Sequence, residues 1–358
     1  MKKFTIAAAA LMATSAFAGD HSINLQGRMG WINTNRDQAK TGLPSDSRIQ
    51  AEVLDLLFTG KLTSNTTYQV GLNLAASSDA TVTGDDATSK YIDTIYITRT
   101  LADGLTLDIG KRNLLGGGFE VTHGTVDQYA KSNYWTTVDN TGPQFGATLS
   151  KVFGGHTVMA QLSNGNLTRT SGGTGSDNVS QSKYGYAAEW LASWSDMVKT
   201  NVGYTVVPVW KPTATPNPVT KDTTLLGAGL QLNVAKFVVE ADYGIVTAKK
   251  ELNSSVTDAK TTSIVGSVAW TGMENLTPFA KFMVDTKKDG DVASHYGDKS
   301  ETVTSFGLGV EYKESAKDAI RYHAVYTSAK HKYESWKNST DYTASQIFLG
   351  AKIDVNVL

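Results

Sequence analysis

Hydrophobic residues recur at every second position along most of this chain, from about Ile23 to Val357. They come in runs of about ten residues, with polar residues or glycine between them. A β-strand places successive side chains on opposite faces, so each run predicts a strand with one apolar and one polar face. No helical period appears, so no helices are expected to cover the apolar faces.

The first residues have the organisation of a secretory signal peptide. Lys2 and Lys3 form a basic start, residues 4–17 are apolar or small, and Ala16-Phe17-Ala18 is a small-x-small cleavage site. The apolar run is shorter than the roughly 20 residues that span a bilayer as a helix. We therefore expect residues 1–18 to be removed, leaving residues 19–358 as one domain in an exported protein. For an exported chain with so many half-apolar strands, lipid is the expected partner of the apolar faces.

The composition narrows the possible classes of protein further. The chain has no cysteine, and its 33 basic and 34 acidic residues nearly balance. A balanced charge disfavours a nucleic-acid partner, which would need a basic excess. No stretch after the signal peptide approaches 18 uninterrupted apolar residues, so helical membrane spans are excluded.

Counting the alternating runs gives about sixteen strands, an even number as bacterial outer-membrane barrels require. The breaks between runs alternate between short and long, about seven of the former and eight of the latter. The sequence thus predicts an all-β fold, a transmembrane antiparallel up-and-down β-barrel of about 16 strands. The phase of the alternation slips near Val53 and near Asp93, where either a β-bulge or a miscounted strand would explain it.

Aromatic residues cluster at the ends of the runs. Trp194, Trp270 and Tyr312 precede short breaks, and Trp31 lies near a long one. Amphipathic rings are most stable at the boundary between membrane and water, so these residues are expected to form aromatic girdles.

If the apolar faces meet lipid, the alternate positions face the lumen. The titratable residues at these positions are Arg28, Asp108, Arg112, Glu189, Lys199, Glu240, Asp242, Lys281, Glu311, Arg321, His323, Lys352 and Asp354. Side chains cannot fill the interior of a barrel of sixteen strands, so water is expected to occupy it. A charged, water-filled lumen is a diffusion pore.

The longest break, at about residues 112–141, is the predicted constriction. It carries apolar residues that would gain by packing inside the barrel. Folding inward would present Glu120 and Asp127 to the passing solute, with Arg112 and Lys131 on the same loop. A second prediction is a basic strip on the facing wall, formed by Arg28, Arg321 and Lys352. Scattered, solvated charges are the alternative interpretation of these three residues.

No motif points to a cofactor or a metal ion. His123 and Asp127 lie four residues apart but in a glycine-rich loop without a third ligand nearby. The segment from Gly172 to Asp177 matches a single calcium-binding repeat, and such sites need stacked copies. We therefore expect neither a metal site nor a cofactor.

Three segments resemble the general bacterial porins, including the phosphate-selective porin group: YIDTIY at 91–96, LTLDIGK at 105–111 and GGGFE at 116–120. The resemblance implies a homotrimer in the outer membrane of a Gram-negative bacterium, surrounded by lipid and lipopolysaccharide. It also implies passive diffusion of ions and small hydrophilic solutes, and places acidic residues on the third outer loop, where Glu120 and Asp127 match. The chain departs from the family in ending on Leu358 rather than on an aromatic residue.

Two other functions fit such a barrel. A surface adhesin would act through its outer loops, and an outer-membrane hydrolase would need a Ser–His pair, for which His323 is the strand-borne histidine. We expect a porin rather than an enzyme, and the mixed lumen charges leave its solute and ion selectivity open.

Overall fold

The computed structural model describes residues 21–37, 44–75, 92–164, 166–167, 184–211, 219–252, 255–289, 299–315, 318–334 and 340–357. The predicted signal peptide, residues 1–18, lies outside the described residues, as does the segment from Gly172 to Asp177.

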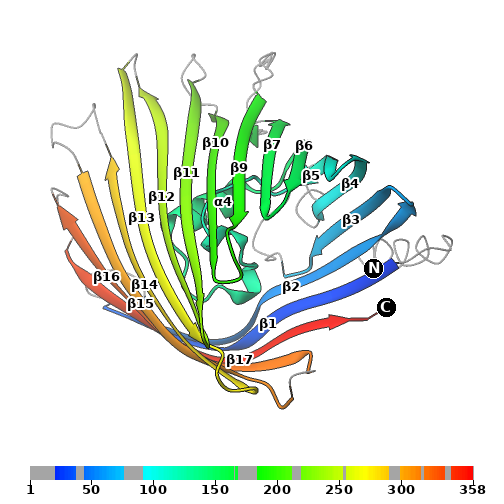
Figure 1. Ribbon diagram of the computed structural model, residues 1–358. Coiled ribbons are helices and arrows are strands. Elements are labelled where there is room, and N and C mark those ends of the chain that lie inside the picture. The colour runs from blue at the N-terminus through cyan, green and yellow to red at the C-terminus, as the bar shows by residue number, and fades with distance from the viewer. Residues whose placement is uncertain are drawn as a thin grey trace, which may run out of the picture.

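One antiparallel sheet accounts for most of the described chain (Figure 1). Its strands are β1 (His21–Arg36), β2 (Asp46–Thr63), β3 (Thr66–Asn73), β4 (Ile92–Ala102), β5 (Leu105–Arg112), β6 (Gln144–Phe153), β7 (His156–Asn164), β8 (Asn166–Leu167), β9 (Tyr184–Ser193), β10 (Val198–Lys211), β11 (Val219–Val234), β12 (Phe237–Leu252), β13 (Ser255–Trp270), β14 (Leu276–Asp289), β15 (Lys299–Tyr312), β16 (Ile320–Glu334) and β17 (Tyr342–Asn356).

The sheet closes on itself because β1 pairs with both β2 and β17. Closure removes the unpaired edges that an open sheet would expose to lipid. The two-residue β8 pairs parallel to the end of β10, and the other sixteen strands pair antiparallel with their neighbours. The predicted up-and-down barrel of about sixteen strands is confirmed.

Both phase slips in the sequence are β-bulges. Along the β1–β2 ladder, Arg28 pairs with Val53 and Met29 with Ala51, so Glu52 is the extra residue. The β3–β4 ladder passes over Asp93 in the same way. An extra residue reverses the inward and outward phase of the rest of its strand. The strand count was therefore right, and the alternative of a miscounted strand is wrong.

The two ends of the barrel differ in their connections. We call the end with the turns at residues 64–65, 103–104, 154–155 and 235–236 the short-turn end, and the opposite end the long-loop end. The longest connection with described structure, residues 113–143, joins β5 to β6 at the long-loop end.

The outer surface is apolar, and the inner surface is polar except where it is packed. Outward-facing Ile109, Leu162 and Leu308 are each more than half exposed, as expected of side chains that meet lipid. The described residues contain no helix of the length and apolarity needed to cross a bilayer.

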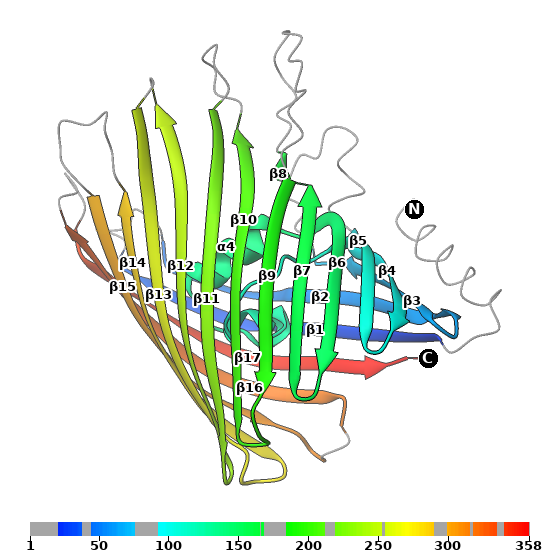
Figure 2. The same cartoon turned by 45° about the horizontal axis from the view of Figure 1, so that its top comes forward.

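Residues 113–143 fold back into the barrel, where Figure 2 shows them enclosed by the strands. They contain two short 3-10 helices, η1 (Glu120–Thr122) and η2 (Thr125–Asp127), and the helix α4 (Asn133–Thr141). We call this segment the inner loop. It contributes to the interior packing, because Tyr134 and Val138 of α4 pack on Leu225 and Val246 of the wall.

Candidate functional site

The inner loop begins with a backbone-to-backbone contact against the barrel wall. A Cβ atom added to Gly117 would overlap the carbonyl oxygen of Gly227 and the amide nitrogen of Gly203. Gly118 has φ +98°, which non-glycine residues rarely adopt. The glycines of the sequence motif at residues 116–118 and those of β10 and β11 thus let two main chains approach closely.

Wall side chains satisfy the backbone of the inner loop at this contact. The Asp242 carboxylate accepts hydrogen bonds from the Phe119 amide at 2.6 Å and the Glu120 amide at 2.9 Å. Asn201 donates to the carbonyl oxygen of Gly118 at 3.1 Å. A loop buried inside a barrel needs such partners, because unpaired backbone groups there are costly.

Glu120 is an anchor of the inner loop. Its carboxylate accepts hydrogen bonds from the Ser132 amide at 3.0 Å and from Lys281 Nζ on β14 at 2.7 Å. Glu120 is 3% exposed, so the prediction that it faces the passing solute is wrong. Lys281 also donates to Gln128 and to the carbonyl oxygen of Ala130, which explains why a lumen-facing lysine is enclosed.

The helix α4 is held to the wall at its N-terminus. Ser132 caps the helix by accepting a hydrogen bond from the Trp135 amide at 3.0 Å. Asp285 on β14 accepts from the Asn133 amide at 3.1 Å, and Ser263 on β13 accepts from the Tyr134 amide at 3.0 Å. The wall therefore satisfies helix amides that have no partner within the helix.

The three residues of the predicted basic strip lie in one row. In the strand register Lys352 pairs with Arg28 on one side and with Arg321 on the other. Lys352 is 1% exposed, 3.0 Å from Asp127 and also bonded to Glu311. The alternative interpretation, scattered and solvated charges, is wrong for Lys352 and Arg28, because the inner loop covers both.

Arg28 binds the backbone of the inner loop as well as a carboxylate. It donates to the carbonyl oxygens of Val126 and Gln128, both at 2.9 Å, and to Glu52 at 2.7 Å. Glu52 is the bulge residue of β2. The bulge therefore supplies the carboxylate that neutralises a buried arginine.

Tyr129 joins the inner loop to the row of cations. Its ring lies 4.9 Å from Arg28 Cζ and 4.6 Å from Lys352 Nζ, both within cation–π range. The ring also stacks on Phe279, with centroids 5.6 Å apart. Burial, with Glu311 nearby, raises the pKa of the Tyr129 hydroxyl, so the residue stays neutral.

The inner loop separates two cavities in the lumen. One, of about 580 Å³, reaches the long-loop end and is lined by Arg36 and Tyr342 as well as Tyr129 and Ala130. The other, of about 280 Å³, is lined by Tyr129, Ala130 and residues near the short-turn end such as Glu240. Tyr129 and Ala130 border both cavities and therefore lie at the division between them.

The fold and this inward loop can be compared with known proteins. The sequence model of a family described as phosphate-selective porin O and P matches residues 23–352. This chain belongs to that family. No curated protein matches its sequence.

Solved porin structures have the same fold. An anion-selective porin from Comamonas acidovorans is 11% identical, with a TM-score of 0.62 over 94% of this chain and 100% of the other. OmpT of Vibrio cholerae, in a trimer form, is 13% identical, with a TM-score of 0.57 over 95% of this chain and 100% of the other. Its membership of the porin family makes the protein an outer-membrane channel for the passive diffusion of ions and small solutes.

The loop charges of this porin are divided between anchoring and exposure. Asp127 is 43% exposed and lies 3.3 Å from Arg321. Burial opposes its ionisation, but Lys352 and Arg321 outweigh burial and hold the pKa of Asp127 below its ordinary value. Lys131 rests over the Trp135 ring at 4.1 Å. Burial lowers the pKa of the Lys131 ammonium, and Asp139 opposes that effect.

Other predicted lumen residues lie on β5, β9 and β10. Arg112 forms an ion pair with Asp108, four residues earlier on β5. Glu189 is buried beside Asn201 and the backbone of Gly116. Lys199 on β10 has no ion pair among the described residues.

Sequence reasoning missed the role of His123. Its Nε2 atom lies 2.9 Å from the Glu240 carboxylate, so a lumen carboxylate of the prediction again binds the inner loop. The sequence showed only that His123 lies on a loop expected to fold inward. That pattern does not predict which residue His123 contacts.

Two of the four predicted girdle residues are exposed. Trp194 is 56% and Tyr312 43% exposed, both near the short-turn end. Indole nitrogens bond to neighbouring strands, Trp31 to Ser47 at 2.8 Å and Trp194 to Thr200 at 3.0 Å. Trp270 ends β13 beside the turn that leads to β14. The girdle remains a prediction for these four residues.

Proposed function

We propose that the inner loop is the constriction of this porin and that Asp127 and Lys131 set its ion preference. This proposal rests on the observation that Tyr129 and Ala130 border cavities on both sides of the loop. A solute that crosses the lumen must pass the segment at this division.

Some of the charged side chains near this segment are paired with other protein groups, whereas others can act on a permeating ion. Arg28, Lys281 and Lys352 are bound to carboxylates or carbonyl oxygens of the inner loop or the wall. Lys131 lines the cavity of about 580 Å³ and also, together with Arg48, a third cavity of about 490 Å³ between the loop and β1–β2. Lys131 has no carboxylate at ion-pair distance among the described residues, so its charge acts on the permeating ion.

The test is single-channel recording with reversal potentials in a salt gradient. Lys131→Glu reverses one charge at the constriction and should shift the reversal potential towards cation preference. Asp127→Asn should shift it the other way and by less, because Lys352 and Arg321 neutralise Asp127 already. Lys236→Glu, an exposed site in the turn between β11 and β12, is the matched control. Equal selectivity in the Lys131 and Lys236 variants would refute the assignment.

The same proposal covers assembly and export. The trimer form of the Vibrio cholerae protein supports a homotrimer for this chain. The basic start and the Ala16-Phe17-Ala18 site support export with cleavage after Ala18. N-terminal sequencing of outer-membrane protein and cross-linking before denaturation test these two points. A retained Met1 or a monomeric band would contradict them.

The channel is proposed to be non-enzymatic. His323, the histidine that a barrel hydrolase would use, packs against Tyr129 with ring centroids 5.1 Å apart and is 6% exposed. A catalytic base needs to reach the proton that it removes. His323→Ala should leave any ester hydrolysis by a purified sample unchanged.

A further inference from the structure

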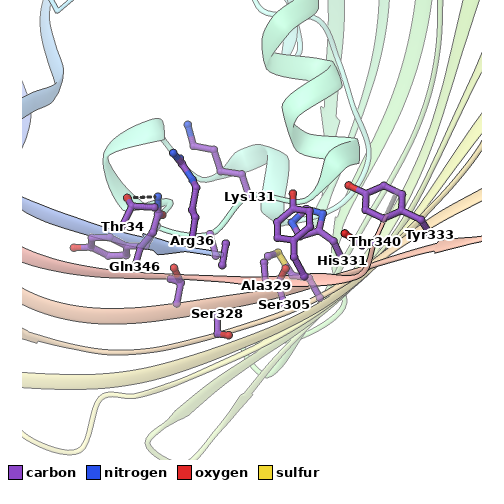
Figure 3. Close-up of a pocket in the computed structure, with 16 residues that line it drawn as sticks. Thr34, Arg36, Lys131, Ser305, Ser328, Ala329, His331, Tyr333, Thr340 and Gln346 are labelled. Atoms are coloured by element: carbon purple, nitrogen blue, oxygen red, sulfur yellow. Dashed lines mark hydrogen bonds between the residues drawn. The ribbon is translucent and has the colours of Figure 1, made fainter. Parts of the chain in front are cut away.

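The larger cavity of the lumen, on the long-loop side of the inner loop, has two chemically different sides. Figure 3 shows Arg36 and Lys131 on one side, and His331 and Tyr333 on the other. None of the described residues that line this cavity is acidic. At about 580 Å³ it falls within the range of small-molecule sites.

One side of the cavity is an array of three nearly parallel rings. His331 and Tyr342 stack with centroids 4.3 Å apart and an angle of 10°. Tyr333 lies 6.4 Å from His331 and 6.3 Å from Tyr342, at angles of 20° and 28°. Glu301 fixes the imidazole plane through a contact of 3.0 Å to His331 Nδ1. Such an array offers flat apolar surface that is already ordered.

The other side is cationic. Arg36 and Lys131 have no ion pair among the described residues, and Lys131 is seated on the Trp135 ring. Hydroxyl groups of Ser305, Ser328 and Thr340 also line the cavity. Serine and threonine hydroxyls both donate and accept hydrogen bonds, which suits a solute with several hydroxyl groups.

We propose that this cavity is a binding subsite for an anionic pyranose, a sugar acid or a sugar phosphate. The flat face of the sugar ring would stack on His331, Tyr333 or Tyr342, its hydroxyl groups would meet the serines and threonine, and its anionic group would reach Arg36 and Lys131. This inference rests on the channel function of the lumen. A simple anion would leave the rings unused, and a neutral sugar would leave the two cations unused.

The experiment measures block of the ion current through the purified porin in planar bilayers. The probes are glucuronate, glucose 6-phosphate, glucose and inorganic phosphate. Both anionic pyranoses should block with a half-saturation concentration at least about tenfold below that of glucose, since one charge-assisted hydrogen bond supplies about that factor. They should also block at lower concentrations than inorganic phosphate, which has no ring to stack on the aromatic side chains. The two anionic probes together tell which anionic group fits better.

Variants separate the two sides of the subsite. Tyr342→Ala should weaken block by both anionic pyranoses several-fold and leave block by inorganic phosphate unchanged, whereas Tyr342→Phe should retain the wild-type block. Arg36→Gln should remove the advantage of the anionic pyranoses over glucose. Tyr322→Ala, on the outer face of β16 and 45% exposed, is the matched control.

The block measurements can overturn the proposed subsite. Equal block by inorganic phosphate and the anionic pyranoses, or an unchanged block in Tyr342→Ala, would overturn the inference. Salt conductance of each variant at the wild-type value shows that the barrel has folded. Absence of block together with a selectivity shift in Lys131→Glu would overturn the subsite alone and leave the proposed constriction standing.

Discussion

Two parts of the inner wall carry similar polar residues but use them differently. On β12 to β17 the charged groups bind the inner loop, as Asp242, Lys281 and Lys352 do. On β5 they pair along the wall, as Arg112 does with Asp108. An inward-facing charge is thus an anchor in one part and a lining group in the other, although both follow the same alternation.

The largest expected effect comes from removing an anchor charge. Lys281→Met leaves the buried Glu120 carboxylate without its cation, which costs about 3–5 kcal/mol in comparable pairs. The inner loop should detach, giving larger and noisier single-channel currents. The matched variant Arg112→Met, on the other part of the wall, should change the current noise far less. Similar noise in both variants would contradict the distinction between the two parts of the wall.

A smaller effect is expected at the glycine contact. Gly117→Val forces the inner loop away from β10 and β11, since its Cβ overlaps the main chain there. Overpacking of this kind costs about 1–3 kcal/mol. Guanidinium unfolding and channel noise measure the loss. Gly124→Ala is the control, because a Cβ at Gly124 meets no atom within 4 Å. If Gly117→Val left both the unfolding midpoint and the channel noise at wild-type values, the close contact would not be needed.

The smallest effect is a pH dependence of the His123–Glu240 contact. The hydrogen bond to Glu240 raises the pKa of His123 above its ordinary value, although burial opposes the shift. A raised pKa means that the contact stabilises the folded loop fully below the ordinary pKa of about 6.5 and less as the pH rises through the folded-state pKa.

Channel noise should therefore increase modestly above neutral pH. The contribution is below about 1 kcal/mol, because the His123 side chain is 40% exposed and solvent screens the pair. His123→Gln should abolish this pH dependence. A pH profile unchanged by that variant would assign the effect to another group.

The membrane barrel was predictable because alternation is a local property. Whether a residue such as Leu308 or Lys352 faces the lipid or the lumen follows from neighbouring residues alone. The bulges at Glu52 and Asp93 left visible slips in the phase of the alternation. The inward course of residues 113–143 was also predictable, since a long loop with apolar residues such as Leu115, Tyr134 and Trp135 gains by burial.

The sequence by itself determined that the chain forms a lipid-facing wall around a polar lumen. The tertiary structure alone decided which polar residues meet the solute. Glu120 and Lys281 are 161 positions apart along the chain, and Asp127 and Lys352 are 225 positions apart. Pairing at such separations depends on where the closed wall places the loop, whereas the alternation of side chains depends only on the geometry of a single strand.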